Sequence, residues 1–183
     1  MIVRDRAGAF SGLENDYRRG TAPAGSVELF REAVPEDADR LRRMFARCSR
    51  ETIYLRFHAS WPTVPEWAIG LLLAGAESGR DGRSIVAVAG TEIAGQAMYV
   101  RDPRDGREAE VAAVVEDRHQ SGGVGRLLLS EIAAEARRAG FETLTCTTLG
   151  DNYRLLSIVS RLFPGSRTSY AGGECSIRVP LAV

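Results

Sequence analysis

The chain has 183 residues, with 24 basic and 24 acidic side chains and a formal net charge of zero at pH 7. This length fits one domain of ordinary size, and a content of 44% hydrophobic and 26% charged residues is typical of a globular protein. The balanced charge gives no electrostatic reason to expect nucleic acid or an anionic membrane surface as a partner.

The N-terminal part of the chain reads as a leader followed by a strand and a helix. Residues 1–26 are rich in glycine and arginine and show no period, so we expect a loosely packed leader before a single domain at 27–183. Residues 27–34 alternate as a strand does. Pro35 and the acidic residues after it are typical of a helix start. The three-to-four spacing then predicts an amphipathic helix with its apolar face formed by Leu41, Met44, Phe45 and Cys48.

The middle of the chain is expected to contain two more helices and a meander of strands. Residues 50–60 have the composition of a short helix, and a second helix is predicted at 65–78, after a proline. Residues 83–90 and 93–102 flank a short turn and predict an antiparallel hairpin. Residues 108–117 are expected to form the next strand.

The C-terminal part begins with a strongly amphipathic helix at 126–140, which ends in basic residues and a glycine. Its apolar face has a four-residue spacing formed by Leu128, Ile132 and Ala136. A β-rich run at 142–150 follows, then a helix at 151–163 with Asn152 at its start and a closing hairpin at 167–181. The order of strand, helices, three strands, helix, strand, helix and hairpin predicts a mixed α/β (α+β) fold.

The segment "HQSGGVGRLLL" (119–129) places three glycines at the start of the helix at 126–140. The first N–H groups of a helix have no partner inside it and attract anions, and glycine lets a phosphate approach the backbone. A Walker loop requires lysine, which this chain lacks entirely, and the third glycine of the dinucleotide fingerprint is missing. The segment therefore predicts another phosphate ligand. The alternative is a tight turn with glycine at positive φ.

The loop spells Q-x-x-G-x-G from Gln120 to Gly125, and it resembles the acyl-CoA pyrophosphate loop of the GNAT superfamily of N-acetyltransferases. The resemblance extends from Val27 to the C-terminus and includes the order of strands and helices. It implies a mixed, mostly antiparallel central sheet with flanking helices. It also implies a pair of strands splayed by a bulge in the strand at 108–117, and acetyl-CoA as the acetyl donor.

The same resemblance implies a set of donor contacts. The loop would bind the phosphates, and the strand before it would pair with the pantetheine arm. The N–H of Val114 or Val115 would polarise the thioester carbonyl, and Asn152 would lie near the pantetheine or diphosphate arm. Arg126 is either a phosphate contact or a solvated arginine at a helix start. The expected donor-binding residues are Ala113, Val114, Val115, Gln120, Ser121, Gly122, Gly123, Val124, Gly125, Arg126 and Asn152.

Within the superfamily, "FREAVPEDADRL" (30–41) and "CSRETIYLRFH" (48–58) resemble the branch of bacterial protein-lysine acetyltransferases. That branch has a strand glutamate ten residues before the loop, and Glu110 has this spacing from Gln120. The resemblance implies that Glu110 is the general base, with Glu108 and Glu116 as competitors. Arg56 either shapes the acceptor pocket or is a surface arginine beside packed helices.

We therefore expect an N-acetyltransferase that acetylates an acceptor amine, a protein lysine, by direct attack with a glutamate base. The alternatives are a small-molecule amine acetyltransferase and a non-catalytic acyl-CoA sensor. One departure concerns Val159, which occupies the position where many family members carry a tyrosine as general acid. We expect a monomer or homodimer that binds no nucleic acid. Because the chain has no lysine, it cannot acetylate its own lysine side chains.

Cysteine and histidine are too few and too scattered for a metal site. The three cysteines, Cys48, Cys146 and Cys175, are far apart and show no C-x-x-C spacing. The first residues lack the apolar core of a secretory signal, and the longest apolar run is too short to cross a bilayer. We expect a cytoplasmic protein with no metal and no membrane partner.

Overall fold

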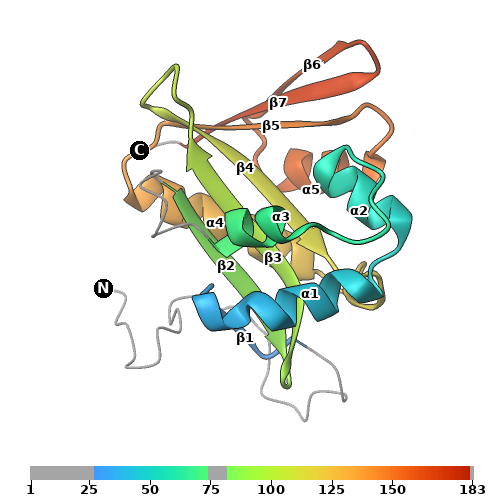
Figure 1. Ribbon diagram of the computed structural model, residues 1–183. Coiled ribbons are helices and arrows are strands. Elements are labelled where there is room, and N and C mark those ends of the chain that lie inside the picture. Colours follow the sequence, from blue (N-terminus) through green and yellow to red (C-terminus); the bar gives the residue numbers. More distant parts are fainter. Residues whose placement is uncertain (1–26, 74–81, 182–183) are drawn as a thin grey trace.

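The computed structural model describes residues 27–73 and 82–181, so the predicted leader at 1–26 lies outside the described residues. These residues form a seven-stranded sheet in the order β1-β2-β3-β4-β5-β7-β6, with helices on both faces (Figure 1). The pair β4–β5 is parallel, and the other neighbouring pairs are antiparallel. The predicted mixed fold with a mostly antiparallel sheet is confirmed.

The helices and strands follow the predicted order. The first half contains β1 (Leu29–Glu32), the 3-10 turn η1 (Pro35–Asp37), α1 (Ala38–Arg47), α2 (Arg50–Phe57), α3 (Glu66–Leu73), β2 (Gly82–Ala89), β3 (Glu92–Arg101) and β4 (Glu108–Val115). The second half contains the 3-10 turn η2 (Asp117–His119), α4 (Val124–Arg138), β5 (Thr143–Leu149), α5 (Tyr153–Leu162), β6 (Arg167–Ala171) and β7 (Glu174–Pro180). The predicted helix at 50–60 is shorter in the structure, because His58 adopts a left-handed backbone with φ of 51° that ends α2.

The sheet separates two apolar clusters. One cluster packs against α4 and α5, and the other packs against α1, α2 and α3. In Figure 1, α1 and α3 lie in front of the sheet and α4 lies behind it. Side chains alternate between the two faces along a strand, so Ala109 and Val111 join the α4 cluster while Val114 joins the other cluster. Glu110 shares the face of Val114 and therefore points towards the side of α1, α2 and α3.

The strands β4 and β5 separate part-way along their length, as the resemblance implied. They pair in parallel from Glu108↔Thr143 to Glu110↔Thr145 and then diverge. We call the end of this pairing the fork, and the diverging segments, 111–115 of β4 and 146–149 of β5, the wedge. The predicted bulge in β4 is wrong, because the β3–β4 register has no shift. Instead, β4 stays paired with β3 while β5 follows β7 along its whole length, and the twist of the sheet separates the two halves.

Candidate active site

The main chain of β4 bonds alternately to the two sides of the strand. At one end, the carbonyl of Glu108 accepts a hydrogen bond of 2.9 Å from the N–H of the residue that follows β3. At the other end, the N–H of Glu116 donates a hydrogen bond of 2.9 Å to the carbonyl of Ala94 in β3. The register between these two bonds is regular. In an antiparallel ladder, alternate residues bond to the same neighbour. The even-numbered residues of β4 therefore bond to β3, and Ala113 and Val115 direct their main chains into the wedge.

This alternation corrects one predicted donor contact. Val114 has its main chain bonded to β3 and its side chain buried in the α1–α3 cluster, so its N–H is not directed at the wedge. The carbonyl of Val115 accepts a hydrogen bond of 2.9 Å from Nε2 of Gln120. The N–H of Val115 and both main-chain groups of Ala113 are directed into the wedge, and these suit an extended ligand that would pair as another strand does.

The glycine loop ends in the uncapped N-terminus of α4. Gly123 is the N-cap residue with φ of 87°, and no side chain accepts a hydrogen bond from the first turn of the helix. Ser121 also has positive φ, at 64°. A Cβ placed on Gly123 would meet no atom within 4 Å, so the loop is open on this side. The exposed first-turn N–H groups and the helix dipole fit the pyrophosphate of a coenzyme A.

The side chain of Gln120 braces the loop instead of pointing freely out of it. Its Nε2 donates to Val115 and, at 3.1 Å, to Oγ1 of Thr52, while its Oε1 accepts from Arg154. The hydroxyl of Thr52 in turn donates to Oδ1 of Asp117 at 3.1 Å. Thr52, Asp117 and Arg154 are not among the site residues predicted from the sequence. Only a helix-start pattern, Ser49 followed three residues later by Thr52, is visible in the sequence, and it does not reveal a partner 65 residues away.

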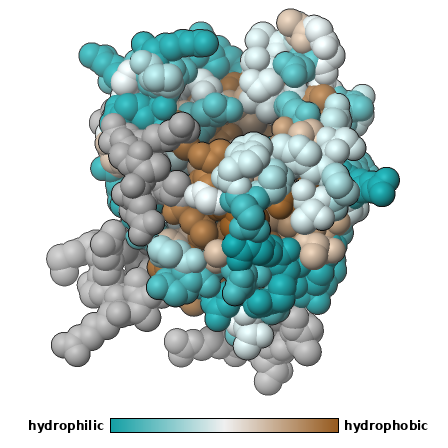
Figure 2. Space-filling model, in the orientation of Figure 1, coloured by the Kyte–Doolittle hydropathy of each residue, from teal (hydrophilic) through white to brown (hydrophobic). Residues whose placement is uncertain are grey.

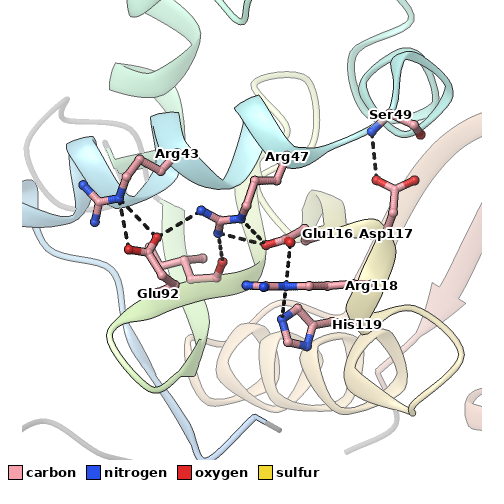
Figure 3. A network of polar contacts seen from close by, with 9 residues as sticks. Arg43, Arg47, Ser49, Glu92, Glu116, Asp117, Arg118 and His119 are labelled. Atoms are coloured by element: carbon pink, nitrogen blue, oxygen red, sulfur yellow. Dashed lines mark hydrogen bonds and ion pairs between the residues drawn. The ribbon is translucent and has the colours of Figure 1, made fainter. Parts of the chain in front are cut away.

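Asp117 joins the loop to the start of α2 in two places. It accepts a hydrogen bond of 2.9 Å from the N–H of Ser49 in addition to the bond from Thr52 (Figure 3). Burial alone would raise the pKa of Asp117, but the hydrogen bonds from Ser49 and Thr52 outweigh it and hold the pKa below its ordinary value. Asp117 is therefore a charged link between α2 and the end of β4.

The remaining predicted donor residues take different positions. Asn152 caps α5, because its Oδ1 accepts from the N–H of Leu155 at 3.2 Å and its Nδ2 donates to Thr148 at 2.9 Å. Arg126 is exposed in the first turn of α4 and forms no ion pair with the described residues. Val159, where a tyrosine was noted as common, is buried in the core and has no proton to donate.

The three glutamates on or beside β4 differ in their partners. Glu108 is paired with Arg178, with Nη1 of the arginine 3.0 Å from the carboxylate. Glu116 is buried, and Arg47 and Arg118 bind it at 2.8 and 2.7 Å (Figure 3). Glu110 is exposed at the fork, and its carboxylate forms no ion pair or hydrogen bond with the described part of the chain. Glu110 is thus the carboxylate of this strand that is free to accept a proton from a substrate.

A network of arginines fixes the end of β4 to α1. Arg47 of α1 bridges Glu116 and Glu92, and Arg43 holds Glu92 from the neighbouring turn at 3.0 Å (Figure 3). Below them, Arg118 donates to Nε2 of His119 at 3.1 Å. Burial lowers the pKa of His119, and the charge of Arg118 adds to this effect. The carboxylate of Glu116 is therefore held in structural ion pairs with arginines, which makes it a poor candidate for the base.

Arg56 of α2 lies at the fork. Its Nη2 donates to Sδ of Met98 at 3.4 Å, and its Cζ is 4.8 Å from the ring centroid of Phe57. Its charge interacts with Glu110 on β4 and with Cys146 on β5, and burial lowers the pKa of Arg56 to about 10. Its Nε is buried and has no hydrogen-bond partner among residues 27–73 and 82–181. An unfilled donor therefore lies beside the proposed base.

The described residues meet the requirements of neither a metal site nor a membrane-spanning helix. Within the described ranges, no cluster of three or more histidine, cysteine or acidic side chains is arranged to hold a metal ion. No helix in these ranges has the length and apolarity that a membrane span requires. Neither finding provides a site beyond the wedge and the glycine loop.

The sequence profile of the Acetyltransferase (GNAT) family matches residues 38–158, which include β4, the glycine loop and most of α5. The chain belongs to the GNAT acetyltransferase family. It is therefore an acetyl-CoA-dependent acetyltransferase, and the wedge and the loop are the family's expected location for the acetyl donor.

Solved structures agree with this assignment. The GNAT domain of S. lividans PAT is 26% identical, with a TM-score of 0.75 over 83% of this chain and 89% of that chain. The structure of yncA from Salmonella typhimurium, which contains its cofactor acetyl-CoA, is 18% identical, with a TM-score of 0.64 over 84% and 93%. The ribosomal-protein-alanine N-acetyltransferase of Brucella melitensis is 19% identical, with a TM-score of 0.66 over 82% and 98%. The last two show a shared fold.

Proposed function

We propose that this GNAT enzyme transfers the acetyl group of acetyl-CoA to a lysine side chain of a protein, with Glu110 as the general base. The observation that carries the proposal is the contrast along β4. Glu108 and Glu116 are held by arginines, whereas Glu110 is exposed and unpaired at the fork. An amine bound beside Glu110 would lie at the end of the wedge, next to the main-chain groups that suit the donor.

The donor side of the site follows from the main chain. The N–H groups at the start of α4 would hold the pyrophosphate, and Ala113 and Val115 would pair with the pantetheine arm. The thioester of acetyl-CoA supplies the activated acyl group. The N–H of Val115 or Ala113 would stabilise the negative charge that develops on its carbonyl oxygen.

The acceptor side needs a proton acceptor, because a lysine amine with a pKa near ~10.4 is mostly protonated at neutral pH. Glu110 removes one proton from the ammonium group, the neutral nitrogen bonds to the carbonyl carbon, and the C–S bond breaks. The second N–H proton of the adduct passes to the departing sulfur, so the products are the amide and the thiol of coenzyme A. The departing thiolate has an ordinary pKa of ~8.5 and leaves without a tyrosine at position 159. No covalent acyl-enzyme is required by this sequence of bonds.

A protein lysine is the proposed acceptor for two reasons. The segments at 30–41 and 48–58 resemble the protein-lysine branch of the family. In addition, Glu66, Glu92 and Glu116 on the side of α1, α2 and α3 are each paired with arginine, so they are not free to bind a polyamine. Apolar side chains gather in the middle of this side, with hydrophilic ones around them (Figure 2).

The base is tested by comparing Glu110→Gln with Glu108→Gln, a matched control two positions away on the same face of β4. We expect Glu110→Gln to lower kcat by about 10²- to 10⁴-fold while the Kd for acetyl-CoA stays near that of the wild type. Glu108→Gln should lose its arginine partner and keep its turnover. Equal turnover of the Glu110→Gln variant and the wild type would remove Glu110 as the base.

The acceptor is tested by thiol release with a panel of lysine-containing proteins, free amino acids, polyamines and aminoglycosides. We expect a kcat/KM for the best protein that exceeds the best small amine by at least about tenfold, which corresponds to ~1.4 kcal/mol. Preference for a polyamine or an aminoglycoside would favour a small-molecule enzyme. The absence of lysine in the chain removes self-acetylation of lysine side chains as a background signal.

A further inference from the structure

The inference concerns Arg56 and rests on the proposed function of the site. We propose that Arg56 is a specificity-determining residue whose guanidinium donates a hydrogen bond to a carbonyl oxygen of the acceptor, as in the main chain of a lysine-containing peptide. The enzyme then selects an amine that is attached to an amide over a plain alkylamine or a polyamine.

Arg56 has unfilled hydrogen-bonding capacity. The guanidinium has five N–H donors, and the hydrogen bond that it forms within the described chain goes to the weakly accepting sulfur of Met98 at 3.4 Å. Its Nε is buried without a partner. A buried donor without a partner costs free energy in the folded state, so the arrangement is costly unless a ligand supplies an oxygen.

Arg56 lies near the fork. Glu110 is the last residue of β4 that pairs with β5, and Cys146 follows directly after the last paired residue of β5. Arg56 contacts Met98, which lies opposite the β4 residue two positions after Glu110 and on the same face of the sheet. The charge of Arg56 interacts with Glu110 and Cys146. An amine that reaches Glu110 therefore brings the rest of the acceptor next to Arg56.

The proposed acceptor and the donor approach the site from different sides. The donor is expected in the wedge, where Ala113 and Val115 direct their main-chain groups along the plane of the sheet. Arg56 belongs to α2 and touches Met98, a β3 residue opposite Ala112 on the α1–α3 side of the sheet. Glu110 also points to this side. The oxygen that Arg56 binds is therefore assigned to the acceptor and not to the thioester.

The charge of Arg56 also predicts which acceptors are disfavoured. A second ammonium group of a polyamine would lie close to the partly buried guanidinium, and like charges repel more strongly there than in bulk water. An amide carbonyl has the opposite polarity and receives a charge-assisted hydrogen bond. One side chain thus provides attraction for a peptide and repulsion for a polyamine.

The experiment uses Arg56→Met, which keeps a similar length and removes the donors, with Arg50→Met as the control. Arg50 is an exposed arginine in the first turn of the same helix. Two acceptors are compared, Nα-acetyl-lysine methylamide and pentylamine, which has the same alkyl amine without the amide oxygens. We expect Arg56→Met to lower kcat/KM for the methylamide at least about tenfold and to leave pentylamine within about twofold. Arg50→Met should change neither value.

The melting temperature of Arg56→Met is a second measurement. If Arg56 had only a structural role, its replacement would lower Tm, whereas the proposed role predicts an increase. Replacing a partly buried charge that has an unfilled buried donor by an apolar side chain of similar size is expected to raise Tm, so Arg56→Met should melt above the wild type. An equal loss with both acceptors, unchanged kcat/KM for the methylamide, or a lower Tm would each overturn the proposal.

Failure of the proposed function remains distinguishable. If the wild type acetylates no amine, the function is wrong, and calorimetric titration of the two acceptors into the enzyme with coenzyme A still tests Arg56. Weaker binding of the methylamide alone in Arg56→Met supports its role, and equal binding by both proteins contradicts it.

Discussion

Thr52 and Gln120 are joined by a hydrogen bond of 3.1 Å between the hydroxyl of α2 and the side chain of the glycine loop. The same hydroxyl donates to Asp117. These bonds connect the helix that carries Arg56 to the loop that is expected to hold the pyrophosphate. The proposed acceptor side and the proposed donor side of the site are therefore joined through one buried threonine.

Thr52→Val should break this coupling while keeping the shape of the side chain. The lost hydrogen bonds leave Asp117 and Gln120 with fewer partners, so we expect a decrease of ~1–2 kcal/mol in the free energy of unfolding and a higher KM for acetyl-CoA. Urea unfolding and steady-state kinetics measure the two effects. Thr52→Ser retains the hydroxyl and should restore both values; a serine variant as impaired as the valine variant would mean that packing, not hydrogen bonding, is responsible.

The two ends of α4 offer a matched test of the phosphate loop. Gly123 and Gly140 have similar φ values, 87° and 90°, and a Cβ on either would meet no atom within 4 Å. Alanine at each position should therefore cost a similar ~1–2 kcal/mol of stability through left-handed strain. Gly123→Ala alone should weaken acetyl-CoA binding, as measured by calorimetry. If Gly140→Ala weakened binding as much, the effect would be one of global stability.

His119 predicts a dependence of stability on pH. Burial, aided by the charge of Arg118, lowers the pKa of His119 below its ordinary value of 6.5, so folding favours the neutral imidazole. The stabilisation is present above the unfolded pKa and is lost as the pH falls below it. The free energy of unfolding should therefore decrease from about pH 7.5 to about pH 5.5.

The matched variant for this prediction is His119→Gln, whose side-chain oxygen can still accept the hydrogen bond from Arg118. We expect a smaller decrease in this variant over the same pH interval, and an NMR titration of His119 with a midpoint below 6.5 in the wild type. Identical pH slopes in the two proteins would assign the effect to other groups.

The sequence predicted the elements well because each one carries a local signal. The amphipathic period of α4 placed Leu128, Ile132 and Ala136 in the core, where they lie, and Asn152 was correctly placed at a helix start. The glycine cluster likewise indicated an uncapped helix N-terminus, because glycine without a capping side chain is a property of the sequence itself.

The parts that could not be predicted depend on contacts between distant segments. Gln120 was expected to bind the donor, yet its side chain reaches Thr52, 68 residues away. The direction of each β4 main-chain group depends on the register with β3, so the sequence could not separate Val114 from Val115. The hydrogen-bonding state of Arg56 also depends on distant residues. Its Nη2 donates to Met98 while its Nε has no partner in the described residues, and neither fact can be inferred from the sequence.

The pH dependence of the defect in Glu110→Gln tests the central claim most directly. Near neutral pH a lysine acceptor is mostly protonated and needs the base, whereas near its own pKa of ~10.4 a large fraction is already neutral. Single-turnover acetyl transfer to a lysine peptide should therefore show a defect of about 10²- to 10⁴-fold near pH 7 that shrinks steadily as the pH rises. A defect of constant size from neutral to alkaline pH would contradict the assignment of Glu110 as general base.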